Sequence, residues 1–410
     1  MGRAAMPMRR WLQPALLLVL AARLATVAVV VVRAEPQVPC YFVFGDSLVD
    51  NGNNNDIASL ARANYPPYGI DFPGGATGRF SNGLTTVDAI SRLLGFDDYI
   101  PAYAGASNDQ LLTGVNFASA AAGIRDETGQ QLVRSHVFFI LDLLKDQARS
   151  ISTLRINLTH TMPVNDMNLQ GQRISFGGQL QNYQAAVQQL VSILGDEDSA
   201  ANHLSQCIFT VGMGSNDYLN NYFMPAVYST SQQYTPEQYA DVLIDQYSQQ
   251  LRTLYSYGAR KVALMGVGQV GCSPNELAQH SPDGATCVPQ INSAIDIFNR
   301  KLVALVDQFN SLPGAHFTYI NAYGIFEDIL RAPGSHGLTV TNRGCCGVGR
   351  NNGQVTCLPF QTPCANRNEY LFWDAFHPTE AANILVGRRA YSAALPSDVH
   401  PVDLRTLAQL

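Results

Sequence analysis

Charged side chains are scarce in this chain of 410 residues: they make up 14% of it, and the formal net charge is −6. No cluster of Lys and Arg follows the first 34 residues. Proteins that bind nucleic acid neutralise its phosphates with such clusters, so we expect no nucleic-acid partner. The chain also lacks an internal repeat and a linker rich in Pro, Gly or Ser. The sequence therefore predicts a single domain, of a size that α/β enzymes commonly build around one sheet.

Long apolar runs are missing as well, except at the N-terminus. Three arginines precede the apolar stretch 11–32, and the small residue Ala34 lies where a cleavage site is expected. This pattern is typical of a secretory signal peptide at 1–34, followed by a domain at 35–410. An uncleaved membrane anchor is the alternative, because the stretch approaches spanning length, but Arg23 interrupts it. We expect a secreted, extracellular protein with no stable membrane span after signal removal.

All eight cysteines follow residue 34. A secreted chain meets an oxidising compartment, so we expect disulfides. The local pairings expected are Cys272 with Cys287, and Cys345 or Cys346 with Cys357 or Cys364. A zinc site is the alternative for the last four cysteines. Zinc sites favour Cys-x-x-Cys pairs and suitably spaced histidines, which this region lacks, so we expect no metal.

Short apolar or β-branched runs alternate with longer segments of helical periodicity. Strands are predicted at 41–44, 115–117, 207–211, 261–265 and 316–320. Helices are predicted at 84–94, 179–194, 236–257, 291–309 and 379–394. The alternation indicates an α/β protein with a central parallel sheet of about five strands in a three-layer α/β/α sandwich. Ligands bind beyond the carboxyl ends of such strands, and Ser47, Gly123 and Asn216 each follow a predicted strand.

A serine on a turn and a distant acid–imidazole pair carry the strongest chemical signal. The apolar run 41–44 ends abruptly at Ser47, and Asp374 and His377 lie three residues apart near the C-terminus. A serine hydroxyl is a poor nucleophile unless a base lies within reach and a third group fixes the tautomer of that base. We therefore predict Ser47 as nucleophile, His377 as base and Asp374 as orienting carboxylate. Alone, Asp374 and His377 would indicate only a surface or capping pair.

Attack on an ester carbonyl develops an oxyanion, which preorganised donors stabilise. Asn216 follows a predicted strand and offers an amide donor. Gly123 ends a loop of small residues, so its N–H could approach a substrate closely. Their alternative interpretations are a turn residue for Asn216 and a backbone hinge for Gly123. Asp46 and Asp50 are rival carboxylates for the triad, but hydrogen bonding within the serine loop explains them better.

The serine lacks the second glycine of a Gly-x-Ser-x-Gly elbow, which argues against an α/β-hydrolase. Instead, four segments in this order, FGDSLVDNGNNN, GVNFASAAAGI, GMGSNDYLNNY and DAFHPTEAAN, resemble the signature blocks of the plant GDSL esterase/lipase family of SGNH hydrolases. The resemblance implies a flavodoxin-like fold and ester hydrolysis without a cofactor. Carried over to this chain, it implies a triad of Ser47, Asp374 and His377, and an oxyanion hole of Ser47, Gly123 and Asn216.

One segment does not fit the resemblance, because residues 133–170 interrupt the expected join between DETGQQL and GQRISFGG. We favour a translated intron as the hypothesis, since Val codons begin with GT and Gln codons can end in AG. A lid or surface loop and a membrane-binding segment are the alternatives. The sequon at Asn157 lies inside this insertion, so if the native protein lacks the insertion it also lacks this glycosylation site.

These observations predict a secreted serine esterase or lipase that acts through an acyl-enzyme. Its substrate is expected to be a small or polymeric ester, such as an acyl lipid, an acetylated polysaccharide, or a cutin-like or phenolic ester. A transacylase is one alternative; the other is a noncatalytic glycan- or lipid-binding protein, or an inactive product if the insertion disturbs the Gly123 loop. A general base must be neutral, so we expect activity to fall with pH across about pH 8 to 5, where imidazoles titrate.

Overall fold

The computed structural model describes residues 2, 35–130 and 173–410. The predicted signal peptide, apart from Gly2, and the predicted insertion at 133–170 with its Asn157 sequon lie outside the described residues. The described residues between Pro36 and Leu410 form one compact unit. No helix among these described residues is long and apolar enough to cross a membrane.

The centre of this unit is a five-stranded sheet in the order β1-β2-β3-β4-β7. Its strands are β1 (Tyr41–Gly45), β2 (Ile208–Gly212), β3 (Lys261–Met265), β4 (His316–Ile320) and β7 (Val399–His400). The first four pair in parallel, and β7 runs antiparallel to β4. The predicted sheet of about five strands is confirmed, but its fifth strand is β7. The predicted strand at 115–117 is wrong in extent, since only Asn116 forms isolated bridges, with Val43 and Ala102.

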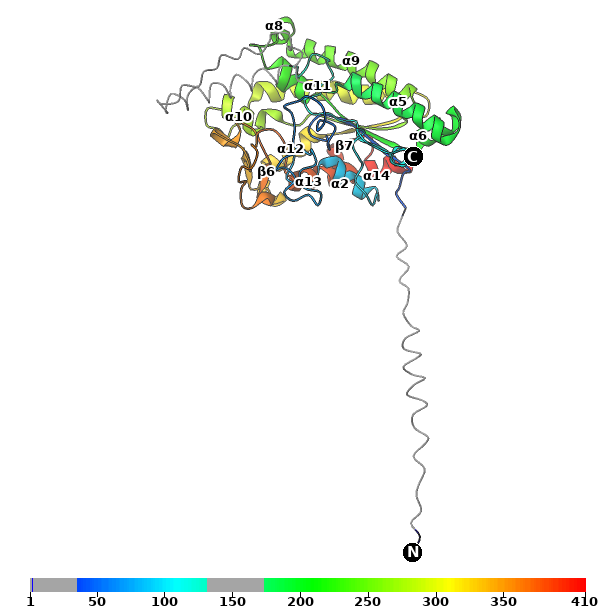
Figure 1. Ribbon diagram of the computed structural model, residues 1–410. Coiled ribbons are helices and arrows are strands. Elements are labelled where there is room, and N and C mark those ends of the chain that lie inside the picture. The colour runs from blue at the N-terminus through cyan, green and yellow to red at the C-terminus, as the bar shows by residue number, and fades with distance from the viewer. Residues whose placement is uncertain (1, 3–34, 131–172) are drawn as a thin grey trace, which may run out of the picture. The chain divides into compact units, whose positions relative to one another are not determined.

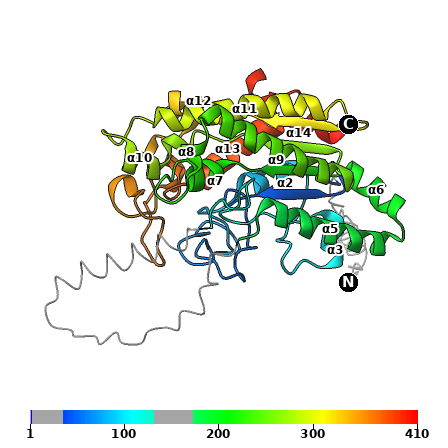
Figure 2. The same cartoon turned by 90° about the horizontal axis from the view of Figure 1, so that it is seen from above.

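Helices cover both faces of this sheet, which gives the predicted three layers (Figures 1 and 2). One face carries α5 (Phe176–Leu194), α6 (Glu197–Gln206), α9 (Pro236–Ser256) and α11 (Pro289–Phe309). The opposite face carries α2 (Thr86–Leu93), α12 (Ala322–Arg331), α13 (Glu380–Tyr391) and α14 (Leu404–Gln409). Local chemistry marks their starts: a capping box of Thr85 and Asp88 begins α2, and α9 and α11 each begin with proline.

Strand side chains alternate between two hydrophobic cores, one on each face of the sheet. Phe42 and Phe44 pack into the core under α5, α9 and α11. Tyr41 and Val43 pack into the core under α2, α12 and α13. A parallel strand buried on both faces needs such an uninterrupted apolar run, which is the pattern that made β1 predictable.

A third, smaller core lies under the loops around β5 (Val340–Gly344) and β6 (Tyr370–Phe372), which form a two-stranded parallel sheet. It contains Trp373 and three of the nearby half-cystines. The disulfides of the protein join Cys40 to Cys207, Cys272 to Cys287, Cys345 to Cys364, and Cys346 to Cys357. The expected Cys272–Cys287 bridge is confirmed, and the last four cysteines are paired as disulfides.

Shorter elements complete the described chain. The α-helices are α3 (Asn108–Thr113), α7 (Ser215–Asp217), α8 (Thr230–Gln233) and α10 (Pro274–His280). The tighter or wider helical turns are η2 (Tyr218–Tyr222), η3 (Val270–Cys272), η4 (Pro333–His336), η5 (Arg350–Asn352), η6 (Arg367–Glu369) and η7 (Pro396–Asp398). These short elements lie in the connections between strands.

Candidate active site

Ser47 lies on a turn directly beyond the carboxyl end of β1. The carbonyl of Asp46 begins this turn by accepting a hydrogen bond from the N–H of Val49 at 3.2 Å. Gly45 must be a glycine, because a Cβ at this position would lie 2.5 Å from Val49 Cγ2 and 3.0 Å from the carbonyl oxygen of Gly212. The serine is therefore held where the strand stops.

Gln179 of α5 anchors the end of β1 from the helical layer. Its buried side chain accepts a hydrogen bond from the N–H of Gly45 at 3.0 Å and donates to the carbonyl of Gly45 at 2.8 Å. Both backbone groups of the residue two positions before Ser47 are thus satisfied by one amide. This contact ties the position of the serine turn to α5.

Ser47, His377 and Asp374 form one chain of contacts. The Oγ atom of Ser47 lies 2.8 Å from Nε2 of His377, although 330 residues separate them in sequence. Nδ1 of His377 lies 2.8 Å from both carboxylate oxygens of Asp374. A carboxylate on Nδ1 favours the tautomer that leaves Nε2 free to accept a proton from the serine hydroxyl.

Asp374 is fully buried, and every contact around it favours its ionised form. Tyr68 donates to its Oδ2 at 2.5 Å and Thr356 donates to the same atom at 3.1 Å, while the N–H groups of Phe376 and His377 donate to Oδ1. Burial alone raises the pKa of this carboxyl, but His377 and these hydrogen bonds outweigh burial and lower the pKa below its ordinary value. The carboxylate is therefore charged at neutral pH.

Aromatic rings pack around the His377 imidazole, whose residue is only 8% exposed. The ring of Phe80 lies against it with centroids 4.9 Å apart. Tyr68 packs edge-on against both Phe80 and Trp373. The imidazole is thus held in place by packing as well as by its bond to Asp374.

Asn216 connects the serine turn to the loop that contains Gly123. It lies on α7, after β2, and its Nδ2 donates to the carbonyl of Ala122 at 2.9 Å and to Oδ2 of Asp46 at 3.3 Å. Asn220 donates to Oδ1 of Asn216 at 2.6 Å, which orients the amide with its nitrogen toward these two loops. Asn216 therefore contacts the residues that directly precede the other two predicted oxyanion donors, Ser47 and Gly123.

Gly123 is packed too tightly to be any other residue. An added Cβ would lie 2.6 Å from Thr128 Cγ2 and 2.7 Å from Asp217 Oδ1. Within the part of the chain that the structure describes, no acceptor engages the backbone N–H of Gly123 or that of Ser47. Two N–H donors thus lie on the serine turn and the Gly123 loop, which the amide of Asn216 links by its hydrogen bonds to Asp46 and Ala122.

Asp217 holds the loop after Gly123 in shape. Its buried carboxylate accepts hydrogen bonds from the N–H groups of Ile124 at 2.8 Å and Arg125 at 3.0 Å, and from the hydroxyl of Thr128 at 2.8 Å. Burial raises its pKa to about 6, against these hydrogen bonds. Because Asp217 directly follows Asn216, the same short helix positions the amide and the glycine loop.

The two rival carboxylates take no part in the imidazole contact. Asp46 accepts a hydrogen bond from the N–H of Leu48 at 3.0 Å, and Asp50 accepts one from the N–H of Ala120 at 2.9 Å. Burial raises the pKa of each to about 6. Among the described hydrogen bonds of His377, the only carboxylate is that of Asp374. Both rivals bind backbone, as the sequence interpretation expected.

Several positioning residues gave no sequence signal. Four such residues contact the candidate site through hydrogen bonds: Tyr68, Thr356, Gln179 and Asp217. The bonds of Tyr68 and Gln179 join segments more than a hundred residues apart in sequence. Except for Asp217, which lies in the signature segment GMGSNDYLNNY, nothing in their local sequence distinguishes them from ordinary loop or helix residues. Only the folded chain identifies them.

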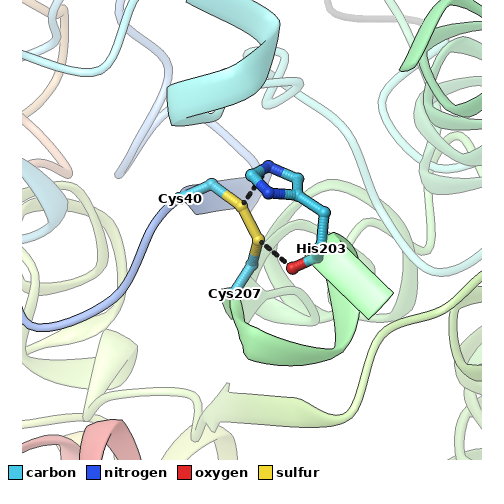
Figure 3. Close-up of side chains that lie close together, drawn as sticks. All are labelled: Cys40, His203 and Cys207. Carbon is cyan, nitrogen blue, oxygen red and sulfur yellow. Dashed lines mark hydrogen bonds between the residues drawn. A yellow bond between two sulfur atoms is a disulfide. The ribbon is translucent and has the colours of Figure 1, made fainter. Parts of the chain in front are cut away.

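A second cluster of reactive side chains lies at the opposite end of β1 and β2 (Figure 3). His203 Nε2 is 3.2 Å from Cys40 Sγ, and it also lies 3.0 Å from the carbonyl of Leu112. Cys40 is bonded to Cys207 in a disulfide. Metals bind the thiolate form of cysteine, which a disulfide does not offer. The cluster is therefore a cross-link between neighbouring strand starts, about 20 Å from Ser47 along β1 at the rise of a β-strand.

Comparison with known proteins gives a consistent result. Residues 41–390 match the family described as GDSL-like lipase/acylhydrolase. GDSL esterase/lipase At5g45670 of Arabidopsis thaliana is 57% identical over 395 residues, which cover 96% of this chain and 99% of that protein. Two others from Arabidopsis thaliana, GDSL esterase/lipase At1g29660 and At1g29670, are 58% and 59% identical, covering 92% and 93% of this chain and 94% and 95% of their own lengths.

Proposed function

The chain belongs to the GDSL-like lipase/acylhydrolase family and is an ester hydrolase, and on that premise we propose that Ser47 is its nucleophile. His377 is the general base, and Asp374 orients the imidazole and stabilises its charged form. The observation that carries this proposal is the unbroken series of 2.8 Å contacts from Ser47 Oγ to His377 Nε2 and from His377 Nδ1 to Asp374.

The reaction proceeds in two halves. Ser47 Oγ attacks the ester carbonyl carbon while His377 Nε2 takes the hydroxyl proton, and the same proton then passes to the leaving alcohol. The product of this half is an ester between Ser47 and the acyl group. In the second half, His377 takes a proton from water, the hydroxide attacks the acyl carbonyl, and the proton returns to Ser47 Oγ as the acid departs.

The oxyanion of each tetrahedral intermediate is stabilised by the backbone N–H groups of Ser47 and Gly123 and by Nδ2 of Asn216. The N–H groups of Ser47 and Gly123 support this assignment, because no acceptor among the described residues engages them. Nδ2 of Asn216 keeps its 2.9 Å bond to Ala122 and exchanges the longer 3.3 Å contact with Asp46 for the oxyanion.

Hydrolysis of p-nitrophenyl acetate and butyrate by purified protein tests the nucleophile. Ser47→Ala is expected to lower kcat by about 10⁶-fold, as in other serine hydrolases that lose the nucleophile. Ser192→Ala, which removes an exposed hydroxyl of α5 that donates to the carbonyl of Gln188, serves as the matched control and should keep activity within about twofold of the wild type. Equal activity in the wild type and Ser47→Ala would contradict the proposal. Ester products with added alcohols would instead indicate a transacylase.

We also propose that the protein is secreted after cleavage behind Ala34. The basic and apolar pattern of residues 1–34 and the four disulfides support this proposal. N-terminal sequencing of protein from the culture medium of expressing plant cells should read from Glu35. Protein that stays in the cell with its first 34 residues attached would contradict it.

The insertion at 133–170 is proposed to be dispensable. Its described flanks meet at one carbonyl: Gln130 donates to the oxygen of Asp126 at 3.0 Å, and Arg173 donates to the same oxygen. A short connection therefore suffices between them. Deleting 133–170 should leave the melting temperature and kcat/KM for p-nitrophenyl butyrate unchanged, and a variant that fails to fold would refute this. Transcripts that consistently retain these codons would overturn the intron hypothesis.

A further inference from the structure

An apolar pocket opens beside the candidate catalytic residues. It lies at the carboxyl ends of β2 and β3, where Gly212 and Met265 line it, and α12 and α13 close it with Phe326 and Val386. It contains about 810 Å³ of empty space when the solvent at its open mouth is counted. The mechanism proposed above makes no use of this space.

The mouth of this pocket is formed by the segments that carry the catalytic residues. Leu48 directly follows Ser47, Phe376 and Pro378 flank His377, and Ser215 precedes Asn216; all four line the pocket. Leu48 is also 36% exposed, so the serine turn presents an apolar side chain at the entrance. The pocket therefore begins next to the nucleophile, within reach of a group attached to the reacting carbonyl.

The lining suits an alkyl chain because it is mostly apolar and uncharged. Among the described residues that line the pocket, none is Asp, Glu, Lys, Arg or His. Two of its polar members are occupied by protein partners: Thr86 donates to Asn383 at 3.1 Å, and Asn383 donates to the carbonyl of Leu84 at 2.9 Å. The other polar residues of the lining are the uncharged Ser215, Gln269 and Ser273. Met265, with its flexible thioether side chain, adapts to chains of different shape.

We propose that this pocket binds the acyl chain of an aliphatic carboxylic ester, so that the substrates are esters of medium-length or longer fatty acids. The inference rests on the proposed function of Ser47. The acyl group stays bonded to Ser47 through the second half of the reaction, whereas the alcohol must leave before water enters. A recess that begins one residue from the nucleophile therefore suits the part of the substrate that remains.

Gly268 is a position of the pocket lining at which a Cβ can be added without a clash. It lines the pocket, its φ lies outside the left-handed region, and an added Cβ would meet only Phe326 Cδ2 at an ordinary 3.9 Å. Gly268→Leu therefore places a branched side chain in the pocket. The matched control is Gly334→Leu, because a Cβ at Gly334 meets nothing within 4 Å and this glycine lies outside the pocket.

Three substrates separate the acyl side from the alcohol side: p-nitrophenyl acetate, p-nitrophenyl octanoate and octyl acetate. The wild type should prefer p-nitrophenyl octanoate to p-nitrophenyl acetate. Gly268→Leu should lower kcat/KM for the octanoate by about tenfold or more, because even one methylene in an apolar pocket changes kcat/KM by that order. Both acetates should change by less than about twofold. Phe326→Ala, which enlarges the pocket, should move the optimum to a longer acyl chain.

The outcomes are distinguishable. A loss on octyl acetate equal to that on the octanoate, or no loss on the octanoate, would overturn the acyl-chain assignment and leave the esterase standing. The same losses in Gly334→Leu would overturn it as well. Absence of Ser47-dependent hydrolysis of p-nitrophenyl acetate by the wild type would overturn the proposed function and this inference with it.

Discussion

The two halves of the candidate site are built by different means. Ser47 and Asn216 follow β1 and β2, so the backbone hydrogen bonds of the central sheet place them at one edge. Asp374 and His377 lie between β6 and α13, against loops held by the Cys345–Cys364 and Cys346–Cys357 disulfides. The nucleophile half is thus positioned by regular structure and the base half by side chains and cross-links.

The difference predicts where the site tolerates change. In the base half, Thr356 lies on a cross-linked loop and Tyr68 comes from a distant segment, and both donate to Asp374. Loss of one such side chain changes the electrostatics of the imidazole directly. In the nucleophile half, the backbone hydrogen bonds of the sheet, which point mutations do not remove, share this work with side chains such as Gln179. The predictions below test this contrast from the largest expected effect to the smallest.

Asp374→Asn should lower kcat by about 10⁴-fold, because an amide can present N–H where the imidazole needs an acceptor and so favours the wrong tautomer. Asp46→Asn, at the rival carboxylate of the nucleophile half, should lower kcat by less than about tenfold, because it changes one bond to Asn216 and one to the turn. Steady-state kinetics with p-nitrophenyl butyrate measure both. Losses of similar size would remove the distinction between the two carboxylates.

Asn216→Ala should lower kcat by about 10²–10³-fold with a small change in KM, as expected for the loss of one oxyanion donor. Asn220→Ala is the control, because Asn220 orients the Asn216 amide without facing the proposed oxyanion. Its effect should be at most about tenfold, in keeping with an indirect role. A KM effect without a kcat effect in Asn216→Ala would mean that the amide binds the ground state and the transition state equally, which would contradict its role as an oxyanion donor.

Tyr68→Phe should lower kcat by about tenfold, because Asp374 loses its 2.5 Å hydrogen bond while the aromatic packing remains. That bond lowers the pKa of Asp374, so its removal raises this pKa. The control is Tyr65→Phe, which removes a bond to the carbonyl of Cys357. The pH–kcat profile should change in the first variant alone, and a matching change in the second would assign the effect to packing of the loop.

The sheet and the large helices were predictable because their residues alternate or repeat with a strict period. The four parallel strands and helices α2, α5, α9, α11 and α13 all fall at predicted segments. β7 was missed because two residues carry no period, and Asn116 makes a bridge only because Val43 lies beside it. Tyr68 was missed because its role depends on Asp374, 306 residues away, and no local pattern records such a contact.

Stability should rise as the pH falls from about 7.5 to 5. Burial raises the pKa of Asp46, Asp50 and Asp217 to about 6 and that of Glu276 to about 7. The folded state therefore binds these protons more tightly than the unfolded chain does. The resulting stabilisation is complete below the unfolded carboxyl pKa of about 4 and is lost as the pH rises through 6 to 7.

The melting temperature at pH 5 should exceed that at pH 7.5 by at least about 2 °C, roughly the shift that 1 kcal/mol makes in a domain of this size. Asp46→Asn should reduce the difference, because it removes one of the groups that titrate. A melting temperature at pH 5 that is no higher than that at pH 7.5 would contradict the raised pKa values of these carboxylates.

The central claim is that His377 activates Ser47, and covalent labelling tests it most directly. Diethyl p-nitrophenyl phosphate should form one bond between Ser47 Oγ and phosphorus and release one p-nitrophenolate per chain, seen by intact mass and peptide mapping. We expect a single adduct on Ser47, none in Ser47→Ala, and labelling slowed by at least about 10²-fold in His377→Ala. An adduct on another residue, or labelling of Ser47 at the same rate without His377, would contradict the account.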